Sequence, residues 1–390
     1  MNSLRAIRVC AFSYYFPPHF SGAGLQTLTL AKELSKKGID YFFVTVDNTG
    51  LPRRDNYQGF DIYRITDGPK KHGELALWRN LYRTLKPLRN QFDIIHASGA
   101  TYRNSGVGIV GKLLGKKSLT IVSMAHNDLY HIGRTRIGKV QSFLLDHVDR
   151  YVSLSRQITD EIKSLSLDKA KAVEIPQGVN TERFRPADAH ERAQLRGKLT
   201  LPERPIALYA GVFDSRKNVE WLVHTWLKNR RLLGDWCLLL VGPTSRDEHD
   251  KGLREKLRSV VQHEGLERDI LFGDFSPRLE DYYRAADLFI LPSQNEGLPN
   301  VVLEAMSCGL PCVVTRISGT DDLIDHGDSG MLFGVNDEPS FINAIAPLIS
   351  SQELRRKMGN SAITEIQTRF SSEKSAERYL SLYQSMLQQQ

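Results

Sequence analysis

The chain contains two successive series of short apolar stretches that are separated by segments with helical periodicity. In the first series the strand-like stretches are residues 7–13, 40–46, 93–98, 118–126 and 150–155. The segments between them are amphipathic, as in the predicted helix 24–38, which ends at Gly38. Parallel strands need long crossover connections, usually helices. The alternation therefore predicts a doubly wound α/β domain with a parallel sheet.

The same rhythm restarts after a polar connector at residues 180–205, which contains three prolines. Its strand-like stretches are residues 206–212, 237–243, 269–275, 288–293 and 311–316. A length of 390 residues fits two domains of similar size. We expect two Rossmann-like domains that face each other across a central cleft. Their predicted bounds are 1–185 and 186–370, and residues 371–390 form a helix that packs back on the N-terminal domain.

Composition narrows the class of protein. Hydrophobic residues make up 41% and charged residues 25%, as in a soluble globular protein with an ample core. No apolar stretch reaches the length that spans a membrane. The four cysteines show no paired spacing, which indicates reduced cysteines rather than disulfides or a zinc site: Cys10, Cys237, Cys308 and Cys312. We expect a cytoplasmic protein.

Charge is distributed unevenly along the chain. Residues 1–185 hold 28 Lys and Arg against 16 Asp and Glu, a net charge of +12, whereas the remainder has a net charge of −5. This asymmetry indicates that only the first half meets something anionic. Candidates are a nucleic acid, a membrane surface or a phosphorylated substrate. No helix-turn-helix, zinc-finger or aromatic RNA-binding signature is present, so we expect no nucleic-acid binding.

The stretch NEGLPNVVLEAMSCGLP, residues 295–311, places Glu296 in a turn and Glu304 inside an apolar run. Pro299 suits the first turn of a helix and Gly309 suits its end, so a helix is predicted over about 299–308. Ligands of open α/β sheets bind outside the carboxyl ends of the strands, and a helix N-terminus favours phosphate oxygens. A carboxylate accepts neighbouring sugar hydroxyls, so a nucleotide sugar would satisfy both glutamates. Alternatively, Glu304 pairs with a lysine or arginine in the core.

The string LPSQNEGLPNVVLEAMSCGLPCVVT resembles the donor-site signature, E-x7-E, of family 4 retaining glycosyltransferases, which have the GT-B fold. The resemblance covers most of the chain. FPPHFSGAGLQTLTLAKELSKKG resembles the family's first loop and helix, and AGVFDSRKN resembles its phosphate-binding loop. IPQGVNTERFRP is similar to its interdomain signature. Two positions depart from the pattern, because Asn180 stands where Asp is common and Val212 where Arg is frequent.

The resemblance implies roles for residues of the second domain. Glu296 would bind hydroxyls of the transferred sugar, with the amides of Gly297 and Leu298, and Glu304 would hold the ribose hydroxyls. Lys217, with Arg216, would neutralise the leaving diphosphate. The amides that would face the diphosphate are those of Asn300, Val301 and Val302.

In the first domain, Gly22 and Gly24 open a helix after the first strand, where backbone can approach a phosphate closely. His126 is predicted to end the strand 118–126 and matches the family's histidine near the sugar. Asp128 would orient His126 or bind the acceptor. His131 lies at a poor spacing for a metal pair with His126.

We predict neither a metal nor an organic cofactor. No Asp-x-Asp occurs, and no lysine lies in a pyridoxal phosphate motif. The resemblance implies retention at the anomeric carbon, with attack from the face that the diphosphate leaves and no protein base. The expected reaction is hexosyl transfer from a nucleotide sugar, by analogy UDP-glucose or a similar UDP-hexose, to a glycan or lipid-linked acceptor in polysaccharide or glycolipid biosynthesis. Two alternatives are a nucleotide-sugar epimerase on the same fold and a non-catalytic GT-B partner subunit.

The segment 74–90 places Trp78, Tyr82 and Leu85 on one helical stripe. The neighbouring stripe carries Arg79, Arg83 and Lys86, and further basic residues of this half are Lys70, Lys71, Arg134, Arg136 and Lys139. A basic face with adjacent aromatics suits an anionic bilayer, although a solvated helix packed by its aromatics explains the pattern equally well. The pattern predicts peripheral contact with the inner face of the cytoplasmic membrane.

Overall fold

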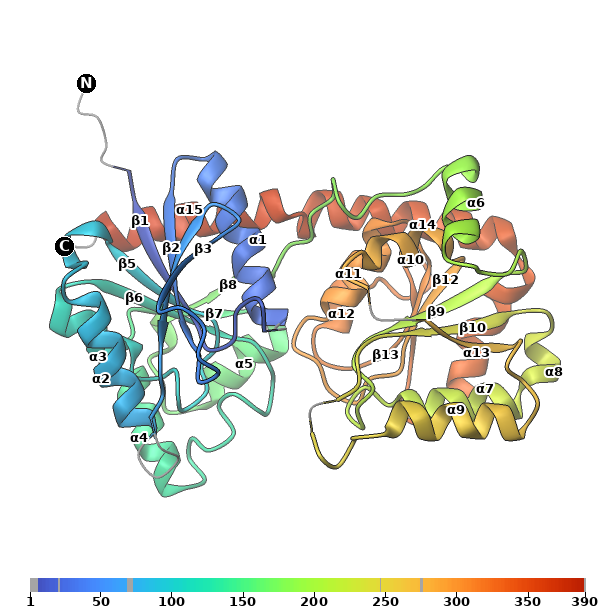
Figure 1. Ribbon diagram of the computed structural model, residues 1–390, viewed down its shortest axis with the longest axis horizontal. Helices are drawn as coiled ribbons and strands as arrows, with labels where there is room; N and C mark the ends of the chain where they lie inside the picture. Colours follow the sequence, from blue (N-terminus) through green and yellow to red (C-terminus); the bar gives the residue numbers. More distant parts are fainter. Residues whose placement is uncertain (1–5, 20–21, 69–72, 246, 274–275, 389–390) are drawn as a thin grey trace. The chain divides into compact units, whose positions relative to one another are not determined.

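The computed structural model describes residues 6–19, 22–68, 73–245, 247–273 and 276–388. The chain forms two compact units, residues 1–178 with 372–390, and residues 179–371 (Figure 1). The predicted first boundary at 185 therefore lies inside the second unit. Residues beyond 178 belong there because Arg183 binds Glu280 and Arg185 binds Glu191.

The first unit is built on an eight-stranded sheet in the order β3-β4-β2-β1-β5-β6-β7-β8. Neighbouring strands are parallel except β3 and β4, which form an antiparallel hairpin. The strands are β1 Arg8–Ser13, β2 Asp40–Val46, β3 Arg54–Tyr57, β4 Phe60–Ile65, β5 Ile94–Ala97, β6 Lys117–Val122, β7 Arg150–Ser153 and β8 Ala172–Glu174. The helices are α1 Gly22–Lys36, α2 Gly73–Leu85, α3 Val107–Leu114, α4 Arg136–Leu145, α5 Arg156–Ser164 and α15 Ser372–Gln388.

The C-terminal helix α15 packs beside α1 and completes the core of the first unit (Figure 1). The Tyr383 hydroxyl lies 2.7 Å from the Tyr41 hydroxyl of β2 and 2.7 Å from His96 Nδ1 of β5. Burial lowers the pKa of His96 to about 3, so this imidazole is neutral at physiological pH. These contacts join the end of the chain to the sheet at its centre.

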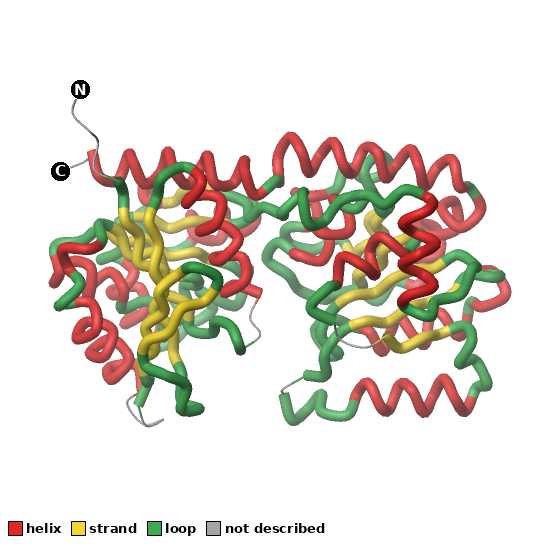
Figure 2. The backbone as a smooth tube through the Cα atoms, turned by 45° about the horizontal axis from the view of Figure 1, so that its top comes forward, coloured by secondary structure: helices red, strands yellow, loops and turns green. Residues whose placement is uncertain are grey.

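The second unit contains a six-stranded parallel sheet in the order β11-β10-β9-β12-β13-β14. Helices cover both faces of the sheet (Figure 2). The strands are β9 Ile206–Ala210, β10 Cys237–Val241, β11 Ile270–Gly273, β12 Leu288–Leu291, β13 Cys312–Thr315 and β14 Met331–Phe333. The helices are α6 Ala189–Lys198, α7 Val219–Lys228, α8 Arg230–Leu233, α9 Leu253–His263, α10 Leu279–Ala285, α11 Asn300–Ser307, α12 Thr320–Leu323, α13 Glu338–Ser350 and α14 Gln352–Glu365, followed by a π-helical turn, Ile366–Phe370.

The four inner strands of this sheet, β10, β9, β12 and β13, are wholly buried, because helices cover both of their faces. β9 and β12 are neighbours in the sheet although many residues separate them in sequence. Their carboxyl ends therefore lie together at one edge. The loops that follow these two strands carry most of the predicted donor-site residues.

Candidate functional site

Glu296 lies in the loop after β12, and its carboxylate is held by two cations. Lys217 Nζ donates to Oε1 at 2.6 Å, and Arg216 Nη1 lies 3.2 Å from Oε2. The side chain of Glu296 is 9% exposed and that of Lys217 is 12% exposed. The structure thus brings together three residues that the sequence assigned to one site.

Hydrogen bonds between the loops after β9 and β12 fix this ion cluster. Asp214 Oδ1 accepts the amide of Lys217 at 2.7 Å, and Asn218, with φ 59°, turns the chain into α7. Asn218 Nδ2 donates to the Pro292 carbonyl at 3.2 Å. Arg216 Nη1 donates to the Asn295 carbonyl at 3.0 Å. The two loops therefore hold each other, and Lys217 cannot move far from Glu296 without breaking these bonds.

The ion pairs decide the charge of Glu296. Burial by itself would raise the pKa of this carboxyl, but Lys217 and Arg216 outweigh burial and hold the pKa below its ordinary value. Glu296 is therefore ionised at neutral pH and can accept hydrogen bonds from hydroxyl groups. One of the three N–H donors of Lys217 points to Glu296, so the ammonium can serve a second oxyanion as well.

Glu304 lies in α11, the short helix that begins after Pro299 and is followed by Gly309 with φ 76°. The buried Tyr283 hydroxyl donates to Glu304 Oε2 at 2.9 Å. Burial raises the pKa of Glu304 to about 7, although the Tyr283 hydrogen bond acts in the opposite direction. No lysine or arginine of the described residues forms an ion pair with Glu304. The alternative of a core ion pair is therefore not observed.

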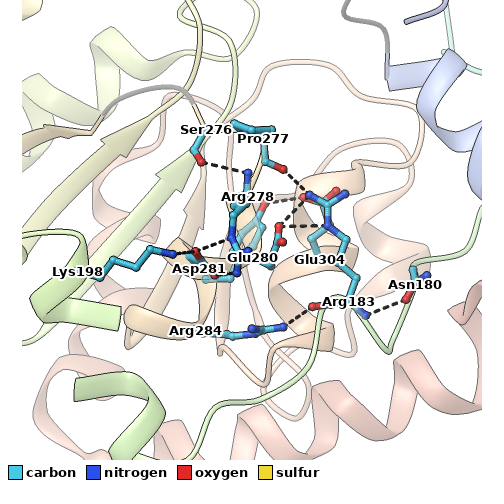
Figure 3. Close-up of polar contacts among 11 residues, drawn as sticks. Asn180, Arg183, Lys198, Ser276, Pro277, Arg278, Glu280, Asp281, Arg284 and Glu304 are labelled. Carbon is cyan, nitrogen blue, oxygen red and sulfur yellow. Dashed lines mark hydrogen bonds and ion pairs between the residues drawn. The ribbon is translucent and has the colours of Figure 1, made fainter. Parts of the chain in front are cut away.

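A second polar network lies beside Glu304 (Figure 3). Arg183 Nη2 lies 2.8 Å from Glu280 Oε2 and donates to the Pro277 carbonyl at 2.6 Å. The Arg183 amide in turn donates to Asn180 Oδ1 at 2.8 Å. Asn180 caps this turn through its side-chain oxygen, so an asparagine can replace the aspartate that is common in the family. Arg183 is neutralised by Glu280, which leaves the Glu304 carboxyl without a direct cation.

Sequence reasoning missed Tyr283, Arg183 and Glu280. Tyr283 and Glu280 belong to α10, and Arg183 lies in the polar stretch interpreted as a connector. The stretch YYRAADLFILPS contains two adjacent tyrosines, and nothing in its spacing shows which of them reaches Glu304. Only the packing of α10 against α11 decides it.

The predicted backbone donors lie around the start of α11. Gly297 and Leu298 are buried in the loop before it. Gly319, with φ 77°, packs so closely against this loop that a Cβ atom added to Gly319 would lie 1.9 Å from the Gly297 carbonyl oxygen. Asn300 and Val301 open the helix. The Val302 amide, which was predicted to face the diphosphate, donates to the Pro299 carbonyl at 3.1 Å.

In the first unit, His126 does not end a strand as predicted. β6 ends at Val122, and His126 lies in the following turn with φ 58° and a side chain that is 65% exposed. Its amide donates to Glu161 Oε2 at 2.9 Å, and its Nε2 lies 3.2 Å from Gln157 Nε2. Both partners come from α5, which the sequence did not connect with His126. The imidazole is held from one side and open to solvent on the other.

Asp128 does not have the predicted geometry for orienting His126 or binding an acceptor. Its side chain is buried, and Oδ2 accepts the Ser123 amide at 2.7 Å, the Ser123 hydroxyl at 2.9 Å and the Met124 amide at 3.2 Å. Burial raises the pKa of this carboxyl. Asp128 therefore shapes the loop after β6. Glu161 occupies the place beside His126 that was predicted for Asp128.

Gly22 and Gly24 lie in the first turn of α1, and Gly24 is buried. Part of the loop before them, residues 20–21, is outside the described residues. One turn later, the Thr27 hydroxyl lies 2.6 Å from the Ser98 hydroxyl, which follows β5. The glycines of α1, Thr27 and Ser98 are thus the small residues near the carboxyl end of β5.

The aromatic stripe predicted on residues 74–90 faces the protein. Trp78 Nε1 donates to the Arg103 carbonyl at 2.7 Å, its ring packs on Gly106, and Leu85 is fully buried. Arg79 and Arg83 are exposed on α2, and Lys86 is exposed just after it. Lys70 and Lys71 lie outside the described residues. The helix therefore offers charge but not the apolar anchor that the membrane prediction required.

Among the described residues, no helix is long and apolar enough to cross a bilayer. No group of three or more His, Cys, Asp or Glu side chains within the same ranges could hold a metal ion.

Comparison with known proteins identifies the family. The profile of "Glycosyltransferase Family 4" matches residues 20–183, and that of "Glycosyl transferases group 1" matches residues 191–365. The chain belongs to glycosyltransferase family 4. The first match covers mainly the first unit, and the second match lies within the second unit.

Relatives of this glycosyltransferase are similar over most of their length. N-acetyl-alpha-D-glucosaminyl L-malate synthase of Bacillus anthracis is 25% identical over 95% of both chains. UDP-Gal:alpha-D-GlcNAc-diphosphoundecaprenol alpha-1,3-galactosyltransferase of Escherichia coli is 26% identical over 79% of both. D-inositol 3-phosphate glycosyltransferase of Acidothermus cellulolyticus is 26% identical, covering 94% of this chain and 86% of the relative.

Solved structures place the family 4 chain in the GT-B fold. Sucrose-phosphate synthase from Thermosynechococcus elongatus has a TM-score of 0.81 at 21% identity, covering 98% of this chain and 100% of the other. HepE of Anabaena in complex with UDP has a TM-score of 0.80 at 16% identity, covering 97% and 100%. The prediction of a GT-B fold built from two Rossmann-like domains is thereby confirmed.

Proposed function

We propose that this glycosyltransferase is a retaining hexosyltransferase that uses a UDP-hexose, with UDP-glucose the leading candidate. The hexose is transferred to a hydroxyl of a glycan or lipid-linked acceptor in polysaccharide or glycolipid biosynthesis. The observation that carries the proposal is the cluster of Glu296, Lys217 and Arg216 at the carboxyl ends of β9 and β12. An ionised carboxylate beside two cations can bind sugar hydroxyls and a diphosphate at the same place.

Each group of the second unit has a distinct task in this proposal. Glu304 accepts the two ribose hydroxyls, and the first turn of α11 meets the diphosphate through the amides of Asn300 and Val301. Glu296 holds hydroxyls of the hexose. Lys217 and Arg216 stabilise the negative charge that grows on the diphosphate as the glycosidic bond breaks, which lowers the barrier rather than the ground state.

The proposed chemistry needs no base from the protein. The acceptor hydroxyl attacks the anomeric carbon from the face that the diphosphate leaves, and a diphosphate oxygen takes the hydroxyl proton. The configuration of the anomeric carbon is then retained. His126 is exposed in the turn after β6 and is backed by Glu161. Its proposed role is to donate a hydrogen bond to a hydroxyl of the sugar or the acceptor.

The related proteins support the choice of donor and acceptor. HepE was solved with UDP and with UDP-glucose, and the Escherichia coli relative is named for a UDP-galactose donor. The acceptors in the relatives' names are L-malate, a diphosphate-linked lipid and inositol 3-phosphate. All three carry negative charge. We therefore propose an anionic acceptor, which agrees with the basic character of the first half of the chain.

The proposed contact with an anionic bilayer is better assigned to α4 than to α2. α4 exposes Ile137, Val140 and Phe143, at 51%, 45% and 58%, respectively. The exposed cations Arg136 and Lys139 lie on the same helix, and Arg134 precedes it. Exposed apolar residues beside cations are typical of a helix that lies in the plane of a membrane surface.

The test of the proposed function is release of nucleotide diphosphate from a panel of UDP- and GDP-sugars, with and without polyprenyl-diphosphate-linked sugars. UDP release that rises when an acceptor is added supports transfer. Interconversion of nucleotide sugars without release of nucleotide would instead indicate an epimerase. Binding of a nucleotide sugar with neither reaction would indicate a non-catalytic partner subunit.

A further inference from the structure

A cavity of about 830 Å³ lies in the first unit, beside the carboxyl ends of β2 and β4. Its walls come from the loop after β2, the hairpin of β3 and β4, and the helix α2. Four arginines line it: Arg53, Arg54, Arg64 and Arg83. Amide and hydroxyl groups of Asn48, Asn80, Thr66 and Thr84 complete the polar wall. None of its lining residues belongs to the ion cluster of Glu296, Lys217 and Arg216.

Two of the arginines build the pocket. Arg64, whose side chain is 4% exposed, donates to the Pro52 carbonyl at 3.0 Å and lies 3.0 Å from an Asp55 carboxylate oxygen. Arg54 lies 3.3 Å from Asp61 and stacks over the Tyr63 ring at 5.4 Å. Their charges are thus met within the hairpin, and their positions are fixed before any ligand arrives.

The other two arginines supply charge to the cavity. Arg53 and Arg83 are both exposed, and neither forms an ion pair with any carboxylate in the part of the chain that the structure describes. They come from different segments of the wall, since Arg53 precedes β3 and Arg83 lies near the end of α2. Each segment thus offers a cation to an oxyanion in the cavity.

The one acidic side chain among the lining residues described, Asp47, is already satisfied. It accepts the Thr49 hydroxyl at 2.7 Å and the amides of Gly50 and Leu51 at 3.0 and 2.9 Å, and His19 Nε2 lies 3.1 Å away. Burial would raise its pKa, but these donors together hold it well below the ordinary value. Asp47 therefore shapes the loop and does not cancel the charge of Arg53 and Arg83.

We propose that this pocket binds the anionic group of the acceptor, a phosphate, diphosphate or carboxylate. The planar guanidinium groups of Arg53 and Arg83 donate paired hydrogen bonds to such oxyanions. The carboxyl ends of parallel strands are where Rossmann-like domains take their ligands. The inference deepens the proposed function and rests on it, because it assigns the site that holds the acceptor's charge.

The experiment is calorimetric titration of inorganic pyrophosphate into the full chain saturated with UDP, which occupies the donor site of the second unit. We expect pyrophosphate to bind, and Arg83→Glu or Arg53→Glu to weaken it at least about tenfold. Arg83→Gln, which is neutral, should weaken binding less than the charge reversal. The matched control is Arg79→Glu, an equal charge change one turn earlier on α2 at a residue that does not line the pocket. It should leave pyrophosphate binding close to that of the wild type.

A parallel titration with succinate distinguishes a phosphate site from a carboxylate site. Equal losses in Arg79→Glu and Arg83→Glu would overturn the proposal, because they would show general attraction to a basic surface. No pyrophosphate binding to the UDP-saturated chain would overturn it as well. UDP affinity, measured separately, should be the same in all variants. If UDP itself does not bind, the proposed function fails, while the titration repeated in Lys217→Ala still tests the pocket.

Discussion

Donor binding should depend on pH through Glu304. Burial raises the pKa of this carboxyl from 4.5 to about 7, so the protonated form is favoured in the folded chain below that pH. Protonation of Glu304 stabilises the folded state fully below pH 4.5, the ordinary pKa of a glutamate, and this stabilisation is lost as the pH rises through 7. The ribose hydroxyls need the carboxylate as acceptor. The donor and the proton therefore compete, and binding should tighten with rising pH.

The size of the effect follows from the ionised fraction. With a pKa of about 7, roughly one Glu304 in eleven is ionised at pH 6 and roughly ten in eleven at pH 8. Because apparent affinity scales with the binding-competent fraction, the dissociation constant for UDP-glucose should fall about tenfold over this range. Binding at pH 7 should release about half a proton.

The assay is titration calorimetry with UDP-glucose, whose diphosphate has no ionisation near neutrality, in two buffers of different ionisation enthalpy. Tyr283, which donates to Glu304, has a strongly raised pKa because it is buried beside this carboxyl, so its hydroxyl stays protonated in this range. Glu304→Gln keeps the shape but carries no proton, so its weaker binding should not vary with pH. Wild-type affinity that stays constant from pH 6 to 8 without proton release would refute the reasoning, as would an unchanged pH dependence in the variant.

Four further expectations concern other groups of the account. Lys217→Ala should lower turnover by about 2.7–4 kcal/mol of barrier while UDP affinity changes little; unaltered turnover would assign the leaving-group charge to Arg216 or a metal. Glu296→Gln should leave the affinity for free UDP nearly unchanged and lower the rate of transfer. Equal losses of UDP affinity and transfer rate would show that Glu296 binds the nucleotide rather than the hexose. A chelator should not inhibit, so strong inhibition by EDTA, reversed by a divalent cation, would contradict the metal-free mechanism. Co-sedimentation with anionic vesicles at low salt should be weakened by Phe143→Ser but not by Arg83→Glu, and no binding at low salt would favour a soluble acceptor.

The fold could be predicted because neighbouring residues in the sequence determine the hydrophobic periodicity of each strand and helix. The strand β2 agrees with its prediction, residues 40–46, and the helix α11 lies within two residues of the predicted 299–308. Strands β3, β4, β8 and β14 were missed. β3, β8 and β14 are edge strands of three or four residues, which are too short to give a periodic signal, and β4 carries Asp61 and Arg64 between its apolar residues. β6 ends earlier than predicted because Asp128 draws the backbone of Ser123 and Met124 into a turn.

The candidate site could be predicted only in part. Glu296 and Lys217 come together because each follows a strand of the same sheet edge, which the strand pattern indicates. The partners of Glu304 and His126 were not predictable, since Tyr283 and Glu161 reach them from other helices, and no spacing in the sequence records that packing. Likewise, Trp78 resembled a membrane anchor until its contact with Gly106 was known.

The central claim is that hexose moves from a UDP-sugar with retention through the Glu296 and Lys217 cluster. The most direct measurement is the proton NMR spectrum of the sugar newly transferred from UDP-glucose to an anionic acceptor, recorded early in the reaction. The account predicts an α-linked glucose with a small anomeric coupling, formed together with UDP and lost in Lys217→Ala. A β-linked product with a large coupling, or transfer that continues undiminished in that variant, would contradict it.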